Sequence, residues 1–108
     1  MDATAQRYPA SLTSNAVLTI DLDALAANYR LLRDKVEPAV CAGVVKANAY
    51  GLGIEPVAKR LWQEDCRLFF VATVDEGIEL RQILGGEAKI AILSGYVRGA
   101  EVELISYN

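Results

Sequence analysis

Histidine is absent from this 108-residue chain, and cysteine occurs only twice, at Cys41 and Cys66. Without histidine, the chain cannot build a Ser–His–Asp triad or a histidine-ligated metal site from its own residues. Two cysteines are too few for a structural zinc site, and their separation is not typical of a redox pair. We therefore expect no metal site in this chain, and we expect both thiols to be reduced.

Long apolar runs and clusters of positive charge are also missing. No stretch approaches the ~20 apolar residues of a membrane span, and residues 1–15 lack the apolar segment of a secretion signal. Lysine and arginine are scattered and the net charge is −3, which argues against a nucleic-acid-binding face. We expect a cytoplasmic protein that binds neither membrane nor nucleic acid, with a mobile tail over residues 1–15.

The remaining chain alternates apolar strands with amphipathic helices. The patterns predict strands over residues 17–22, 40–45, 68–74 and 89–93. They predict a first helix from Asp21 or Asp23 to Val36 and a second over residues 54–64. A third begins at a T-x-x-E capping box, Thr73 and Glu76, and ends at the glycine pair 85–86. A fourth covers residues 101–107. The three later strands are apolar throughout, which predicts burial on both faces of a parallel sheet.

This order of elements predicts an α/β fold, because strands and helices alternate with parallel crossovers. Three such strands leave both sheet edges open. The strand starts near residues 40, 68 and 89 have the spacing of a (β/α)8 TIM barrel, which needs about 250 residues. The predicted fold is a partial barrel of about the first three βα units, and a small flavodoxin-like sheet is the alternative.

The most informative segment begins at Lys46, directly after the valine-rich run 40–45. In a parallel α/β fold this lysine lies at the carboxyl end of a strand, where active sites form. A neutral lysine amine attacks an aldehyde to form a Schiff base, and the hydroxyl of Tyr50, four residues later, can donate to an anion. Considered alone, these residues favour a plainer alternative, a solvated loop with a packed tyrosine.

Three segments in order resemble the alanine racemase family. Residues 44–53, V-V-K-A-N-A-Y-G-L-G, resemble the segment that attaches pyridoxal 5′-phosphate (PLP), and residues 19–33 and 71–81 resemble the family's opening segment and its next strand and helix. The resemblance implies that residues 16–108 are the N-terminal part of a PLP-binding barrel. It implies that Lys46 forms the Schiff base with PLP and then serves as one of two bases at Cα, and that Tyr50 binds the cofactor phosphate.

The resemblance also implies racemisation of L-alanine and D-alanine, which supplies D-alanine for peptidoglycan, by a homodimer. In the family the second base is a tyrosine on a C-terminal β-domain of the other subunit, and the strand predicted at 17–22 packs with that domain. Neither this tyrosine nor the arginine at the pyridine nitrogen has a counterpart here, so we expect the 108 residues alone to be inactive. The formal substitutes are Tyr8, Tyr29, Tyr96 and Tyr107, and no sequence feature orients any of them.

One residue departs from the family pattern, because Leu52 stands where members often have histidine. Several alternatives stay open. The chain could belong to a non-catalytic PLP-binding homeostasis protein with a single-domain barrel, although the strand at 17–22 argues against this. It could belong to a basic-amino-acid decarboxylase, against which the A-N-A-Y-G stretch argues, or to an amino-acid racemase of broad specificity. It could also be a piece of a longer protein.

Overall fold

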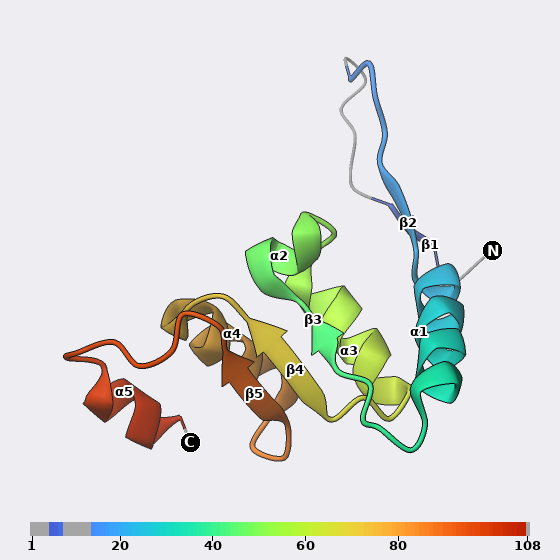
Figure 1. Cartoon of the computed structure of the whole chain (residues 1–108). Helices are drawn as coiled ribbons and strands as arrows, with labels where there is room; N and C mark the ends of the chain where they lie inside the picture. Colours follow the sequence, from blue (N-terminus) through green and yellow to red (C-terminus); the bar gives the residue numbers. More distant parts are fainter. Residues whose placement is uncertain (1–4, 8–13, 108) are drawn as a thin grey trace.

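The structure of the protein is a computed structural model that describes residues 5–7 and 14–107. The elements follow one another as β1 (Ala5–Arg7), β2 (Thr19–Asp21), α1 (Leu22–Val36), β3 (Gly43–Val44), α2 (Lys46–Tyr50), α3 (Ile54–Gln63), β4 (Leu68–Val71), α4 (Val74–Leu84), β5 (Lys89–Ile92) and α5 (Glu101–Ser106) (Figure 1). Strands β3, β4 and β5 form a parallel sheet in that order, and β1 pairs with β2 in a separate antiparallel sheet. The predicted α/β alternation is confirmed.

Helix α1 begins and ends where the sequence indicates. The Asp21 carboxylate accepts a hydrogen bond from the Ala24 N–H at 3.0 Å and so caps the first turn. The helix ends at Val36, two residues before Pro38, since proline disfavours helix in the residue that precedes it. The expected apolar face is only partly buried, because Tyr29 lies in the core whereas Leu32 is 55% exposed.

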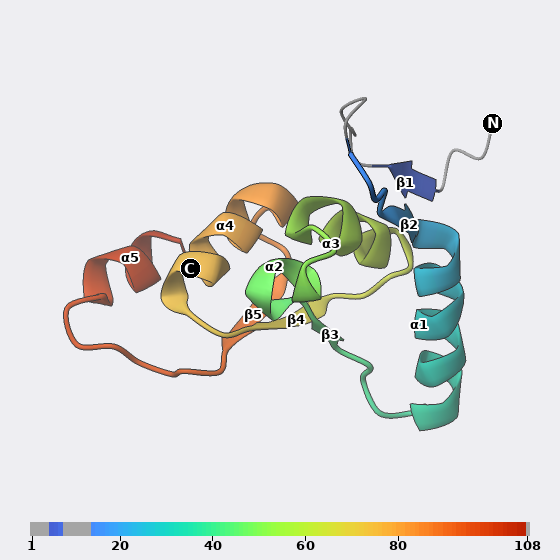
Figure 2. The same ribbon diagram turned by 90° about the horizontal axis from the view of Figure 1, so that it is seen from above.

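Two ion pairs connect α1 to α3. Arg30 pairs with Glu64, just beyond the end of α3, and Asp23 pairs with Arg60, each with a nitrogen-to-oxygen distance of 2.8 Å. Helix α1 lies to one side of the sheet, apart from the strands (Figure 2), and the two ion pairs join it to the region of α3. Such pairs at a partly exposed interface fix orientation more than they add stability.

Helices α3 and α4 lie on the same face of the parallel sheet (Figure 2). Along β4, Phe69 and Val71 are fully buried while the alternate residues are only half-buried, so one face of the strand forms the core. Val40 and Val44 are 75% and 44% exposed. The prediction of burial on both faces is therefore wrong for the described residues, because both helices cover the same side.

Helix α4 follows the predicted capping box. The Thr73 hydroxyl accepts a hydrogen bond from the Glu76 N–H at 3.2 Å, and the Glu76 carboxylate accepts from the Thr73 N–H at 3.1 Å. Gly77 is buried, and a Cβ at this position would lie 3.3 Å from Ile92 Cδ1. Close packing against β5 therefore explains a glycine inside this helix. Gly85 caps the carboxyl end.

Other predictions differ in extent from the structure. The sequence pattern predicts no element before residue 17, whereas the structure has strand β1 there. Residues 1–4 and 8–13 of the predicted mobile tail lie outside the described residues. The strand expected over 40–45 shortens to Gly43–Val44, and the strand expected over 68–74 ends at Val71. Among the described residues, no helix has the length and apolar character needed to cross a membrane.

Candidate functional site

Lys46 lies at the carboxyl end of β3, as predicted. The strands β3, β4 and β5 run in the same direction, and α2 lies just beyond the tip of β3 (Figure 1). The preceding residue, Val45, is fully buried, and its N–H donates to the Phe70 carbonyl of β4 at 2.9 Å. The residue before Lys46 is therefore anchored in the sheet and core, whereas Lys46 itself is half-buried at the sheet edge.

The segment after Lys46 turns in the left-handed sense, which the sequence did not predict. The φ angles are 53° at Ala47, 54° at Asn48, 54° at Ala49 and 57° at Tyr50. A left-handed conformation costs an L-residue roughly 1–2 kcal/mol, so a run of such residues persists only where other contacts hold it. Within the turn, the Ala49 N–H donates to the Val45 carbonyl at 3.0 Å.

Asn48 joins this turn to α3. Its side-chain oxygen accepts a hydrogen bond from the Ile54 N–H at 2.9 Å, and its carbonyl accepts from the Gly53 N–H at 2.9 Å. The first N–H groups of a helix have no partner inside the helix, so Asn48 satisfies one of them from outside. The geometry therefore gives Asn48 a structural role in the turn. Gly53 adopts a φ of 99°, which glycine tolerates at low cost.

Glu76 holds the other end of the turn from the neighbouring βα unit. Its Oε2 atom accepts a hydrogen bond from the Ala47 N–H at 2.7 Å, while its Oε1 atom accepts from Ala72 at 2.7 Å and from Thr73 at 3.1 Å. Desolvation raises the pKa of Glu76, but the three N–H donors and the Lys46 charge outweigh it, so the pKa lies below its usual value. The sequence revealed Glu76 only as a helix cap.

Tyr50 ends the turn at the surface and is 63% exposed. Lys46 and Tyr50 are thus the first and last residues of α2, just beyond the tip of β3, and Tyr50 is accessible to solvent. Leu52, the departure from the family pattern, packs against the hydrophobic core instead of facing solvent freely. Its apolar side chain thus supports the base of the turn by packing rather than by hydrogen bonding.

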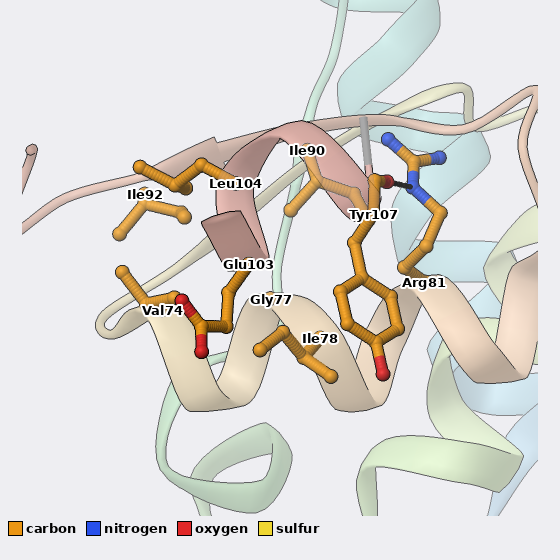
Figure 3. A pocket seen from close by; sticks show the side chains of 9 residues that line it. All are labelled: Val74, Gly77, Ile78, Arg81, Ile90, Ile92, Glu103, Leu104 and Tyr107. Carbon is orange, nitrogen blue, oxygen red and sulfur yellow. Dashed lines mark hydrogen bonds between the residues drawn. The ribbon is translucent and has the colours of Figure 1, made fainter. Parts of the chain in front are cut away.

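A different pocket lies between α4, β5 and α5 (Figure 3). Apolar side chains such as Ile78 and Ile92 line it, and the Arg81 side chain closes one end by donating to the Tyr107 carbonyl at 2.9 Å. None of its lining residues comes from the 46–53 turn. A second hollow, lined by Thr73, Ser94 and others, opens at the carboxyl edge of β4 and β5.

The other tyrosines lie away from the turn or have partners of their own. The Tyr29 side chain is buried and its hydroxyl donates to the Cys41 carbonyl at 2.9 Å. The Tyr96 hydroxyl donates to the Glu101 carboxylate, and this hydrogen bond raises the pKa of Tyr96. Tyr107 lines the pocket of Figure 3. Tyr8 lies outside the described residues.

Comparison with known proteins decides the family. Residues 20–108 match the family model described as "Alanine racemase, N-terminal domain". The chain belongs to this family. The resemblance inferred from the three sequence segments is thereby confirmed. The matched residues include the parallel sheet, the turn at Lys46 and helices α1 to α5.

Individual alanine racemases match most of this N-terminal domain. The enzyme from Rhodospirillum rubrum is 48% identical over 93 residues, which are 85% of this chain and 25% of that protein. The catabolic alanine racemase from Mesorhizobium japonicum is 45% identical over 104 residues, 95% of this chain and 27% of that protein. The chain thus spans about a quarter of the length of these curated relatives.

A solved structure agrees with the fold of this alanine racemase domain. The crystal structure of alanine racemase from Bartonella henselae with covalently bound pyridoxal phosphate has a TM-score of 0.76 and 45% sequence identity. The match covers 81% of this chain and 24% of that chain. The α/β architecture is therefore that of the corresponding part of a known alanine racemase.

Proposed function

We propose that the chain forms the PLP-binding part of an alanine racemase and that Lys46 is the residue that attaches the cofactor. The observation that carries this proposal is the position of Lys46 at the carboxyl end of β3, at the start of a turn held from two sides. The Bartonella henselae relative, 45% identical, has PLP covalently bound. Lysine is the side chain that enzymes use to attach PLP.

The residues of the turn fit a phosphorylated aldehyde. Lys46 supplies an amine for covalent attachment, and the exposed Tyr50 phenol would donate a hydrogen bond to the phosphate. Gly51 has a φ of 85° and nothing within 4 Å of a Cβ position, so the backbone there is open to a close ligand. PLP, when bound, acts as an electron sink that makes the Cα proton of an amino acid acidic.

Lys46 would then hold or move a proton on one face of the substrate Cα, and racemisation needs a base on the opposite face as well. The Tyr29 hydroxyl donates to the Cys41 carbonyl and the Tyr96 hydroxyl donates to the Glu101 carboxylate, so neither is placed for this role. By resemblance to the family, the second base would be a tyrosine from the other subunit of a homodimer. Such an enzyme would supply D-alanine for peptidoglycan in the cytoplasm. The three βα units would be the first part of a TIM barrel.

Reductive labelling tests the assignment of Lys46. The 108-residue chain is incubated with PLP, reduced with borohydride and mapped by peptide mass spectrometry. We expect the label on Lys46, and its loss in Lys46→Arg but not in Lys59→Arg, a control on the surface of α3 whose side chain pairs with Glu55. Preferential labelling of Lys35, Lys59 or Lys89 in the wild-type chain would show that the assignment is wrong.

A non-catalytic PLP-binding barrel is the second candidate. Strand β2 lies outside the parallel sheet and pairs with β1 instead, which favours the racemase, because the racemase resemblance implies an opening strand that packs outside the barrel. A chiral assay for D-alanine separates the two functions. A longer protein containing this chain should racemise L-alanine, whereas the 108 residues with PLP should not exceed the rate of free PLP. The same assay with serine, lysine and arginine measures substrate breadth.

A further inference from the structure

We propose that Glu76 is a positioning residue for Lys46, which acts by holding the peptide that joins Lys46 to Ala47. This inference rests on the proposed attachment of PLP to Lys46, and it assigns a role in the site to a side chain of the neighbouring βα unit. In the sequence, Glu76 shows only the signature of a helix cap. In the structure, it also contacts the turn that begins at Lys46.

The two carboxylate oxygens of Glu76 have different partners. Oε1 accepts hydrogen bonds from the N–H groups of Ala72 and Thr73, which belong to the connection between β4 and α4. Oε2 accepts from the Ala47 N–H at 2.7 Å, across the sheet edge. One carboxylate therefore ties the start of α4 to the first peptide of the turn, and this peptide plane includes the Lys46 carbonyl carbon.

The Ala47 N–H needs an acceptor from outside the turn. The turn's own hydrogen bonds begin later, where the Ala49 N–H donates to Val45 and the Gly51 N–H donates to Ala47. The opening N–H of a helical turn has no internal partner. The pairing of β3 with β4, in which Val44 lies opposite Phe70, brings the two strand ends together so that Glu76 can supply the acceptor.

The contact fixes the backbone on the carboxyl side of Lys46, and Val45 fixes it on the amino side. Val45 is fully buried and hydrogen-bonded to β4. The residues after Lys46 are left-handed, which L-residues adopt only under constraint. If Glu76 did not hold the Ala47 N–H, the turn could relax toward ordinary loop conformations, and Lys46 and Tyr50 would lose their fixed relation. The proposed role is thus to orient, and Glu76 itself contacts no reacting atom.

Glu76→Gln isolates this contact. Glutamine at this position retains a carbonyl oxygen that can cap α4, but its amide nitrogen is a donor and cannot accept from the Ala47 N–H. Thr73→Ala is the matched control, because it removes the hydroxyl that accepts from the Glu76 N–H and leaves the Glu76 carboxylate in place. Thr73→Ala weakens the cap of α4 and leaves the contact with the turn, whereas Glu76→Gln removes the contact with the turn and keeps an acceptor for the cap.

The measurement is borohydride labelling of Lys46 in the 108-residue chain at increasing PLP concentrations. We expect Glu76→Gln to raise the half-saturating PLP concentration about ten-fold, since a hydrogen bond to a charged group is lost. Thr73→Ala should stay within about two-fold of wild type. Equal half-saturation of wild type and Glu76→Gln, or an equal shift in the two variants, would overturn the positioning role. Absence of Lys46 labelling in the wild type would instead overturn the proposed function.

A nuclear magnetic resonance titration of the wild-type chain provides a test that needs no variant to fold. The Ala47 amide proton should follow the titration of the Glu76 carboxylate, with a midpoint below the usual 4.5, because the Ala47 N–H donates directly to that group. The charge of Lys46 also lowers the pKa of Glu76. If the chemical shift of the Ala47 amide proton does not change as the carboxylate titrates, the proposal is contradicted whatever the variants show.

Discussion

Two connections between a strand and its following helix lie on the same edge of the sheet, and they are built differently. Between β4 and α4 the chain needs only Ala72 and Thr73, and a local capping box holds the turn. Between β3 and α3 it passes through residues 45–53 in a left-handed turn. That turn is held by Asn48 at one end and by Glu76, from the other connection, at its start.

The comparison shows how a conformation that is costly by itself is maintained. The short connection satisfies its N–H groups with side chains three or four positions away. The long connection has its first N–H satisfied by a residue 29 positions away in the sequence. A turn that depends on a distant acceptor is specified by the fold as well as by its own residues. Strained backbone held in this way is common at functional sites.

The largest expected effect comes from Lys46→Ala, which removes the reactive group of the long connection. Covalent attachment of PLP should be abolished, because no other described residue of the turn carries an amine side chain. The measurement is the visible absorbance of the PLP-treated chain after removal of free cofactor. Lys46 is only half-buried, so the far-ultraviolet circular dichroism should be unchanged. Full absorbance in the variant would mean that a lysine elsewhere attaches the cofactor.

Tyr50→Phe should have the next largest effect, on the affinity for PLP. The lost hydrogen bond to a phosphate dianion is worth about 1.5–3 kcal/mol, which corresponds to roughly ten-fold to a hundred-fold weaker PLP binding. Because Tyr50 is 63% exposed, the melting temperature should change little. Tyr96→Phe is the control, since Tyr96 is also exposed but hydrogen-bonds to Glu101. Unchanged PLP affinity in Tyr50→Phe would count against the phosphate-binding role.

Asn48→Ala tests the support of the long connection at its α3 end. The variant removes the oxygen that accepts from the Ile54 N–H. It also puts alanine at a φ of 54°, a left-handed conformation that asparagine tolerates better. We expect the free energy of unfolding to fall by about 1–2 kcal/mol in urea denaturation. Asn28→Ala, on the exposed surface of α1, should stay within about 0.5 kcal/mol of wild type. Equal effects of the two changes would mean that Asn48 does not hold the turn.

The smallest effect concerns pH. The pKa of Glu76 is lowered in the folded chain, so its ionised form stabilises the fold above the unfolded value of 4.5. This contribution should be lost as the pH falls from 4.5 through the lower folded pKa. Denaturation midpoints measured between pH 6 and pH 3 should therefore drop less steeply in Glu76→Gln than in wild type. Parallel curves would show that Glu76 is not ionised preferentially in the folded state.

Much of the fold follows from local patterns. A helix cap at Asp21 or Asp23 and the capping box of Thr73 and Glu76 were predicted, and the structure has both, with Asp21 as the cap. Each depends only on residues three positions apart. The predicted burial of Val44 on both faces was wrong. An apolar run indicates that a strand can be buried, but it does not say which elements cover each face.

The candidate site was also predicted only in part from the sequence. Sequence alone placed Lys46 after a strand, with Tyr50 four residues later, and the family resemblance that these residues carry is confirmed by the match over residues 20–108. Only the tertiary structure decided the left-handed sense of the turn and the second partner of Glu76. The reason is physical: strand pairing brings Ala47 and Glu76 together, and hydrogen bonds between residues so far apart leave no periodic pattern in a sequence.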